Sequence, residues 1–238
     1  NETDSLSYGL LVENVKLKLF SDSPTNFITF EQEFGDKYKY LAGNMGWLRD
    51  RRDSAILPRK GTLTRVGGEV SAGDLQYYRL NVFHQWLHPL TRTMTLSLRG
   101  DFGYVGGYNN KPVPFFKNFY AGGPDSVRGY EAFSLGPQDS NGNVLGGTRK
   151  LTGSAEVLFP VPGALNDKSL RLAAFIDSGQ VYGAGEKFAL DELRYSAGVG
   201  IAWSSPFGPL RISFAEPLNE KKGFDKIERI QFTFGSSF

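Results

Sequence analysis

The chain of 238 residues contains no cysteine and only two histidines and two methionines. Without cysteine there can be no disulfide framework, thiolate metal site or thiol nucleophile. An excess of charge of one sign is also missing, because 27 basic residues face 25 acidic residues. This balance argues against a nucleic-acid partner. Apolar runs are only a few residues long, whereas a transmembrane helix needs about 20 apolar residues.

Glycine, at 29 residues, and aromatic residues, at 14% of the chain, are abundant. The mean hydropathy is −0.31. Such a value is compatible with a membrane β-barrel, because a barrel strand exposes only every second side chain to lipid. The periodicity of the apolar residues is therefore the feature that decides the fold class.

The C-terminal segment has the clearest period of two. Its apolar face consists of Ile230, Phe232, Phe234 and Phe238, and its other face is polar or small. The same alternation predicts nine further strands, at 5–19, 38–49, 62–72, 78–86, 94–104, 154–159, 170–177, 193–204 and 210–215. In the first of these the phase slips between Val12 and Val15, which predicts a β-bulge or an early exit into a loop.

The connections between these strands alternate between short and long. The short ones are 51–61, 88–92, 160–168 and 205–209, and the long ones are 20–37, 106–147 and 179–191, with a short exception near 72–75. In outer-membrane barrels short turns face the periplasm and long loops face the exterior. Within the first long loop, 26–34 predicts one or two turns of amphipathic helix with its phenylalanines on one side.

A soluble antiparallel barrel or sandwich would also alternate, but two observations argue against it. Aromatic residues gather at strand ends, as in an interfacial girdle. The predicted interior face also carries seven charges that a small dry core could not accommodate: Arg79, Arg99, Asp101, Glu156, Asp177, Arg194 and Arg211. We therefore predict an all-β fold, an antiparallel transmembrane β-barrel with about ten strands in this chain.

Four motifs together point to a known family. They are Phe119–Gly123 followed by Val127-Arg128-Gly129-Tyr130, the segment Trp47–Asp53 that ends the second strand, the turn Ser205–Leu210, and the closing Phe238. Each motif alone is weak, because glycine and aspartate mark any turn. In combination they resemble the BamA family of outer-membrane protein assembly factors, over essentially the whole chain.

The resemblance implies a sixteen-stranded barrel in the bacterial outer membrane of a Gram-negative cell, preceded by periplasmic POTRA domains. Residues 1–238 then correspond to the last ten strands as a single barrel domain, without POTRA domains. Two interpretations stay open: part of a larger barrel, or a reduced barrel of its own. An open sheet exposes unpaired peptide groups to lipid, so it must close on itself or pair with another chain.

The resemblance further implies that the long loop folds back into the lumen. Its motif, Val127-Arg128-Gly129-Tyr130, would bring Arg128 to acidic groups on the inner wall, which here are Glu156 and Asp177. A guanidinium held by two carboxylates forms strong charge-assisted hydrogen bonds and would latch the loop. The alternative is that Arg128 is a solvated loop charge and the two acids only make the lumen polar.

The last strand is the second candidate site, because the family is thought to open between its first and last strands. The edge formed by Ile230, Phe232, Phe234, Gly235 and Phe238 could template a client strand by β-augmentation. Gly235 is expected either to weaken this strand or to be a small inward residue in a crowded lumen. The terminal Phe238 also resembles the signal that marks outer-membrane proteins for insertion.

A dense charge run lies at the predicted periplasmic end and includes Arg49, Asp50, Arg52 and Asp53. Most such runs are solvated turns, but in this family it would neighbour POTRA domains and assembly-complex lipoproteins. His84 and His88 lie four residues apart without a supporting carboxylate cluster, so we predict no metal site. We expect no other cofactor.

The resulting functional hypothesis is a non-enzymatic insertase that folds and inserts other outer-membrane proteins. Its partners would be the lipid bilayer and unfolded outer-membrane protein clients. One alternative is a two-partner secretion or TamA-like translocation barrel, which would use the same loop arginine. Another is a reduced barrel that acts only as a membrane anchor or passive pore.

Overall fold

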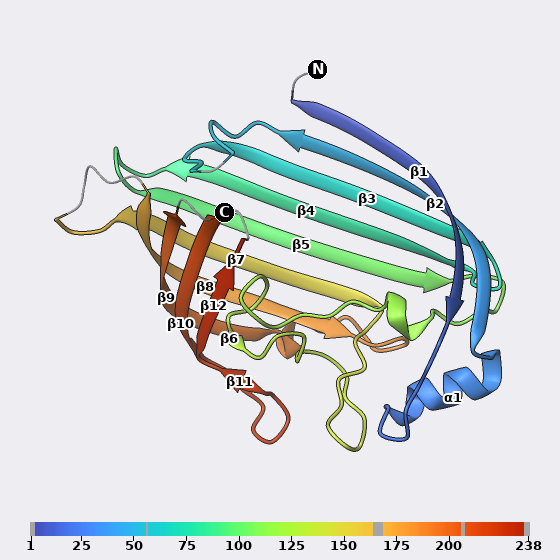
Figure 1. The fold of residues 1–238 in the computed structure, drawn as a ribbon. Coiled ribbons are helices and arrows are strands. Elements are labelled where there is room, and N and C mark those ends of the chain that lie inside the picture. Colours follow the sequence, from blue (N-terminus) through green and yellow to red (C-terminus); the bar gives the residue numbers. More distant parts are fainter. Residues whose placement is uncertain (1–2, 56, 164–168, 206–207, 236–238) are drawn as a thin grey trace.

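The computed structural model describes residues 3–55, 57–163, 169–205 and 208–235. Its main body is a ten-stranded antiparallel sheet that curves into the wall of a barrel (Figure 1). The strands of this sheet are β1 (Asp4–Lys16), β2 (Lys37–Asp50), β3 (Gly61–Gly73), β4 (Tyr77–Pro89), β5 (Thr95–Gly107), β7 (Arg149–Pro160), β8 (Leu170–Tyr182), β9 (Arg194–Ser205), β10 (Gly208–Pro217) and β12 (Ile230–Phe234). Two short strands, β6 (Gly129–Tyr130) and β11 (Ile227–Glu228), pair with each other. The predicted fold class is confirmed.

Strands of the large sheet follow one another in chain order, from β1 at one edge to β12 at the other. Each consecutive pair is antiparallel. Among the described residues β1 and β12 do not pair, so the sheet order does not close into a ten-stranded ring. The chain as described therefore has two free sheet edges.

Alternate side chains separate onto the two faces of the sheet, as the period of two predicts. On β12, Ile230, Phe232 and Phe234 are 59% to 69% exposed on the outer face, whereas Gln231 between them is 3% exposed. Further outward apolar side chains include Leu10, Met45, Val70, Leu80, Ile176, Val199, Ile201, Ile212 and Phe214. This outer face matches the apolar band that a membrane barrel presents to lipid. In the described ranges no helix is both long and apolar enough to cross a membrane.

Of the two explanations for the phase slip between Val12 and Val15, the bulge is wrong, and the strand does end earlier than expected, at Lys16 and not at 19. β1 pairs with β2 in an unbroken register from Asp4–Arg49 to Lys16–Lys37. The apolar phase slips because Val15 faces the interior, where it packs with Leu17 against a buried apolar cluster. That cluster consists of Tyr38, Tyr40, Ala42, Leu75, Tyr77, Val105 and Phe119. The lumen is thus apolar near the loops, and alternation fades there without any change in backbone register.

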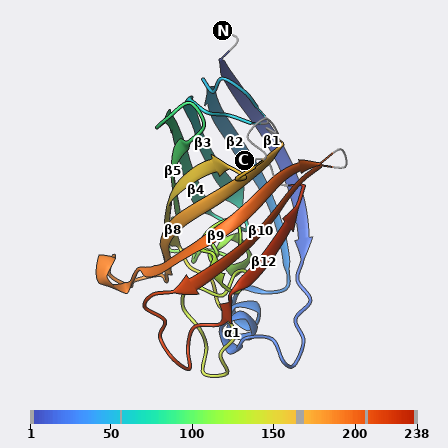
Figure 2. The same cartoon turned by 90° about the vertical axis from the view of Figure 1, so that its left-hand side faces the viewer.

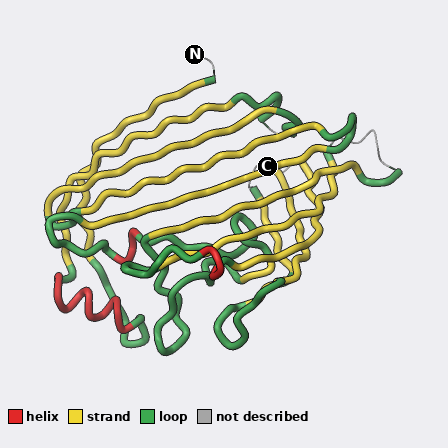
Figure 3. The backbone as a smooth tube through the Cα atoms, turned by 180° about the vertical axis from the view of Figure 1, so that it is seen from behind, coloured by secondary structure: helices red, strands yellow, loops and turns green. Residues whose placement is uncertain are grey.

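One end of the sheet carries the long connections, apart from the short turn 74–76 between β3 and β4 that the sequence predicted, and the other end carries the tighter turns (Figure 3). At the long-loop end lie α1 (Thr25–Phe34), η1 (Phe115–Lys117) and η2 (Leu190–Glu192), together with the segments 108–148 and 218–226. The amphipathic helix predicted at 26–34 is confirmed as α1, and its Phe27 stacks on Phe115 with ring centroids 4.0 Å apart. β1 begins and β12 ends at the tight-turn end.

Candidate functional site

The segment 108–148, between β5 and β7, turns back into the curve of the sheet (Figure 2). Its residues Val127, Arg128 and Tyr130 are at most 1% exposed. Ala121, Val127, Tyr130, Leu135 and Val181 form a buried apolar cluster that includes both loop and wall residues. The loop also bonds to itself, since the Leu135 N–H donates to the Ala121 carbonyl at 3.0 Å. The motif is therefore packed inside the barrel, not solvated.

Arg128 lies against β7 and β8 and reaches both acids named from the sequence. Its Nε and Nη2 atoms donate to the two carboxylate oxygens of Asp177 at 2.6 and 2.8 Å, and its backbone N–H donates to Asp177 at 3.1 Å. Its Nη1 and Nη2 atoms donate to Glu156 Oε2 at 3.4 Å. The three side chains are 1% to 4% exposed. A bidentate fork of this kind fixes orientation as well as distance.

The strand register explains why four wall residues surround this guanidinium. Ser154 lies opposite Asp177, and Glu156 lies opposite Phe175, on the paired strands β7 and β8. Residues two apart share a face, so these side chains form one patch on the inner wall. Arg128 Nη2 donates to Ser154 Oγ at 3.3 Å, and its Cζ lies 3.2 Å from the centre of the Phe175 ring. The patch thus combines charge, hydrogen bonding and cation–π attraction.

The two carboxylates hold Arg128 unequally. Glu156 is shared, because Arg99 Nη2 also donates to its Oε2 at 3.3 Å. Asp177 accepts three hydrogen bonds from Arg128, two from the side chain and one from the backbone. Burial lowers the pKa of the Arg128 guanidinium, but the hydrogen bonds and charge of Asp177, and then those of Glu156, raise it above its usual value overall. Arg128 is therefore a fixed cation whose main partner is Asp177.

Gly129 and Tyr130 fasten the loop on its other side. β6 pairs with β11, so that Gly129 lies opposite Glu228 and Tyr130 opposite Ile227. Gly129 has φ of +90°, and a Cβ there would lie 3.2 Å from the carbonyl oxygen and Cβ of Ala215 on β10. Only glycine combines that backbone conformation with such close approach at low cost. The Tyr130 hydroxyl donates to the Tyr195 carbonyl of β9 at 3.2 Å.

The C-terminal edge differs from its prediction in two ways. The expected single strand is split into β11 and β12, with Arg229 between them. β12 ends at Phe234, and Gly235 follows it with φ of +85°. Among the described residues no atom lies within 4 Å of a Cβ built on Gly235, so crowding by them does not explain this glycine, which instead adopts a left-handed conformation. Phe238 lies outside the described residues.

The charged side chains of the run at the tight-turn end bond to one another and to nearby groups of β1 and the turn. Arg49 Nε donates to Asp4 at 2.6 Å, and Arg52 Nη2 donates to Asp50 at 2.8 Å. Asp53 accepts hydrogen bonds from two backbone N–H groups of the same turn, at 2.8 and 3.2 Å. These bonds hold the shape of the turn 51–60. The geometry accounts for the run as a turn, and it stays a prediction that partners contact it.

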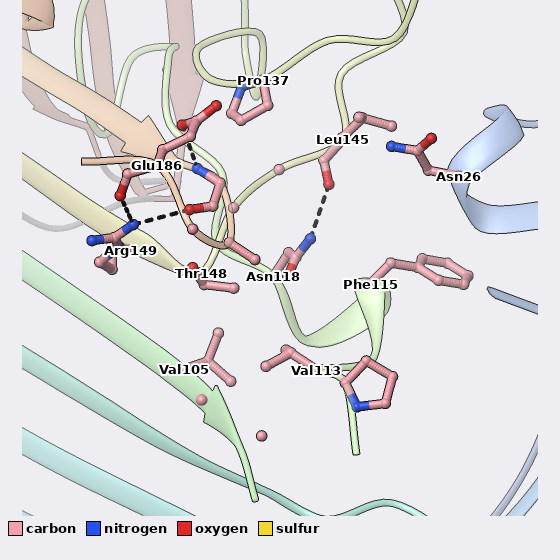
Figure 4. Close-up of a pocket in the computed structure, with 18 of the residues that line it drawn as sticks. Asn26, Val105, Val113, Phe115, Asn118, Pro137, Leu145, Thr148, Arg149 and Glu186 are labelled. Atoms are coloured by element: carbon pink, nitrogen blue, oxygen red, sulfur yellow. Dashed lines mark hydrogen bonds between the residues drawn. The ribbon is translucent and has the colours of Figure 1, made fainter. Parts of the chain in front are cut away.

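A cavity of about 870 Å³ lies at the long-loop end, between α1, η1 and the ends of β5 and β7 (Figure 4). Three of its polar side chains bond to backbone groups: Arg149 donates to the Gly183 and Glu186 carbonyls, Asn118 donates to the Leu145 carbonyl, and the Glu186 carboxylate accepts from the Gly183 N–H. These groups support loops and leave little chemistry for a ligand. Across the part of the chain that is described, no three potential metal ligands come together.

Sequence reasoning missed two wall residues and one edge residue that complete the site. Ser154 and Phe175 have the same inward parity as Glu156 and Asp177, so the alternation could have found them. Gln231 donates from Nε2 to the Tyr130 carbonyl at 2.7 Å. Its inward position on β12 was predictable, but its loop partner, 101 residues away, was not.

A curved antiparallel sheet with an apolar outer face and a buried lumenal loop defines a transmembrane β-barrel of the kind that carries an inward-folded plug. The Omp85 superfamily domain matches residues 1–238. The chain therefore belongs to the Omp85 superfamily. The resemblance to the BamA family is confirmed by the relatives described next.

Two curated relatives are outer membrane protein assembly factors named BamA. The chain is 38% identical to that of Neisseria meningitidis serogroup B, over 100% of this chain and 34% of the relative. It is 30% identical to that of Nitratidesulfovibrio vulgaris, over 100% of this chain and 30% of the relative. The mouse sorting and assembly machinery component 50 homolog is 30% identical over 79% of this chain and 44% of the relative. The chain thus spans about a third of the length of the BamA relatives.

A solved structure has the same fold. The crystal structure of BamA from Haemophilus ducreyi lacking POTRA domains 1–3 superposes with a TM-score of 0.88 and 24% sequence identity. The match covers 100% of this chain and 52% of that one. This agreement extends the confirmation of the barrel fold.

Proposed function

We propose that this chain forms part of an outer-membrane barrel that folds and inserts other β-barrel proteins. The observation that carries the proposal is the loop motif anchored inside the lumen by Arg128, with Asp177 at 2.6 Å and Glu156 at 3.4 Å. Burying three ionised groups is costly unless they are paired and fully hydrogen-bonded. A fold maintains such a cluster where a defined loop position is needed, which fits a latch.

The second element of the proposal is the edge strand. Among the described residues β12 pairs with β10 on one side, and its other side offers peptide N–H and C=O groups. An unpaired edge can template an incoming strand through main-chain hydrogen bonds, with no catalytic side chain. The outward phenylalanines of β12 would meanwhile keep the growing sheet in contact with lipid. The activity is therefore insertion without enzymatic chemistry.

The proposed partners follow from this activity. They are unfolded outer-membrane proteins, the lipid bilayer, and the POTRA domains and lipoproteins of an assembly complex. The proposed location is the bacterial outer membrane. Support comes from the apolar outer face of the sheet and from relatives whose names include outer membrane protein assembly.

The two alternative functions differ from insertion in what they require. A translocation barrel of the two-partner secretion or TamA-like kind would use the same latched loop, so the geometry of Arg128 does not separate it. A closed ten-stranded ring would favour a passive pore or membrane anchor, whereas in the described residues the sheet has two edges. Ion conductance and client insertion, measured in the same proteoliposomes, distinguish the three.

The test is Arg128→Ala in the protein at its full natural length, reconstituted in proteoliposomes. Removing the guanidinium leaves Asp177 buried without its cation and takes one of two arginine partners from Glu156, which should cost about 3–5 kcal/mol of loop anchoring. We expect the loop to become sensitive to chymotrypsin and client insertion to fall at least tenfold. Chymotrypsin is chosen because trypsin would lose a cleavage site in the variant.

The matched control is Arg92→Ala, which removes an exposed arginine from the turn at the opposite end. It should change neither readout. If Arg128→Ala leaves both the protease sensitivity and the insertion rate at wild-type levels, the latch does not exist. If the loop is released but insertion persists, the loop is structural and the proposed mechanism is wrong.

A further inference from the structure

Gln231 occupies a buried position between the loop motif and the edge strand. It is 3% exposed on the inward face of β12. Its Nε2 donates to the Tyr130 carbonyl at 2.7 Å and to Glu228 Oε2 at 3.3 Å. Its Oε1 accepts from the Gly129 N–H at 3.4 Å. Both ends of one carboxamide therefore contact the backbone of the loop motif.

The Gln231 carboxamide bonds to the loop strand β6 beyond the point where the backbone pairing of β6 with β11 ends. β11 pairs with the loop strand β6, and next to this pair the Glu131 N–H donates to the Lys226 carbonyl at 2.9 Å. At Arg229 the chain changes partner, because the Arg229 carbonyl accepts from the Ala215 N–H of β10 at 2.9 Å. From there β12 pairs with the wall. A glutamine side chain has one donor group and one acceptor, as a peptide unit does, so Gln231 can bond to the loop while its own backbone bonds to the wall.

Among the described residues the edge strand β12 has a shorter hydrogen-bond ladder than the other strands of the sheet. β12 is five residues long, whereas the other strands of the sheet have 10 to 14 residues. Fewer ladder hydrogen bonds mean a lower free energy of local opening. Beside β12 the packing of Ile227 on the cluster around Val127 and Tyr130 adds a second tie to the loop. Contacts to the loop are therefore a large share of what positions this strand.

We propose that Gln231 is a positioning residue that ties the edge strand to the anchored loop, so that the two open and close together. In this arrangement Arg128 fixes the loop on β7 and β8, and Gln231 transmits that fixed position to β12. Release of the loop then loosens the edge strand, although the side-chain hydrogen bonds of Arg128 among the described residues go to β7 and β8 and not to β12. This inference rests on the proposed insertion function and names a residue that would regulate the template edge.

The test is hydrogen exchange of the full-length protein in lipid nanodiscs, comparing wild type with Gln231→Glu. The variant has the same shape but replaces the donor that faces the Tyr130 carbonyl and the Glu228 carboxylate with an acceptor. We expect exchange to rise about tenfold in both 128–131 and 230–234, because buried hydrogen bonds are lost on both sides of one side chain. Gln231→Leu, which adds no charge, should produce the same pattern more weakly and covers the case in which Gln231→Glu does not fold.

The matched control is Gln85→Glu on β4. Gln85 is 4% exposed and donates to Ser97 Oγ at 3.2 Å, so the same chemical change is made in the wall away from the loop. It should leave exchange in 128–131 and 230–234 unchanged. Arg128→Lys gives the reciprocal test, since it should raise exchange in β12 as well as in the loop.

The outcomes separate this inference from the function on which it rests. If Gln231→Glu speeds exchange in only one of the two segments, or if Arg128→Lys leaves β12 unchanged, the tie is wrong. This result would stand whether or not the wild-type protein inserts clients. If the tie is present but client insertion by Gln231→Leu proceeds at the wild-type rate, the regulatory role is wrong. If the wild type inserts no client, the proposed function fails and the exchange result is unaffected.

Discussion

Two groups of charged residues in this molecule differ in burial: the anchor around Arg128 and the charge run at 49–53. The anchor around Arg128 joins residues 28 and 49 positions apart, and its side chains are nearly inaccessible. The charge run at 49–53 bonds mostly within its own turn, as in the pair Arg52–Asp50, two positions apart. The run is the denser in sequence, yet the anchor is the more constrained in space. The density of charged residues along the chain therefore does not indicate which of them are held in a fixed, buried position.

The physical difference is solvation. Exposed ion pairs gain little free energy, because water and salt screen them. A buried pair is different, since removal of one partner leaves an uncompensated charge in a low-dielectric setting. Substitutions should consequently have large effects in the anchor and small ones in the run. The following predictions test that contrast.

The largest loss of loop anchoring in this series is expected from Asp177→Asn, and a smaller loss from Glu156→Gln. Asp177→Asn removes the carboxylate that accepts three hydrogen bonds from Arg128, and should cost about 3–4 kcal/mol of loop anchoring. Glu156→Gln weakens contacts of 3.4 Å to a carboxylate shared with Arg99, and should cost about 1–2 kcal/mol. Hydrogen exchange of residues 127–130 gives both values. Equal effects, or the reverse order, would contradict the assignment of Asp177 as the main partner.

A smaller effect is expected from the aromatic beneath the guanidinium. Phe175→Leu should weaken loop anchoring by about 1–2 kcal/mol, because the cation–π contact at 3.2 Å is buried. The comparison variant is Trp47→Leu, which removes the ring 5.1 Å from Arg49, whose side chain is 37% exposed. It should leave chymotrypsin cleavage of the loop unchanged. Matching losses from both variants would show that burial does not set the strength of these contacts.

The smallest effect is expected in the charge run. Arg52→Ala breaks the pair with Asp50; the Arg52 side chain is 8% exposed, but the carboxylate left behind is 35% exposed and can be solvated, so the loss should be no more than about 1 kcal/mol. The loss should shrink further at 0.5 M salt, because ions reach and screen the Asp50 carboxylate. Thermal unfolding at low and high salt measures it. A loss as large as that of Asp177→Asn would mean that the turn 51–60 has a structural role comparable with the anchor.

The sequence was sufficient for features with short-range causes. The period of two on β12 placed Ile230, Phe232 and Phe234 outward and Gln231 inward, because adjacent side chains on a strand must point to opposite faces. The helix α1 was predictable from three phenylalanines at helical spacing. The loop motif drew attention to Arg128 only through its resemblance to a family, since a lone arginine in a turn has no distinctive local signature.

The sequence-based predictions that were wrong or incomplete depend on contacts or backbone conformations that neighbouring residues do not reveal. Val15 seemed out of phase because apolar residues from distant strands line the lumen at that height. Gly235 reads like a strand glycine, but its φ of +85° ends the strand. From the sequence Gln231 is one more inward polar residue. Its partners, Gly129 and Tyr130, lie in a loop 102 and 101 residues earlier in the chain.

By itself the sequence determined an alternating antiparallel barrel wall, the ends at which its turns and loops lie, and the facing of Glu156 and Asp177. These follow from strand geometry and from the different affinities of side chains for lipid and water. Only the tertiary structure decided that Arg128 grips Asp177 more closely than Glu156, that Phe175 lies beneath it, and that Gln231 joins the loop to the edge strand. Those contacts depend on how a 41-residue loop, 108–148, packs inside a curved sheet, and no periodicity encodes that packing.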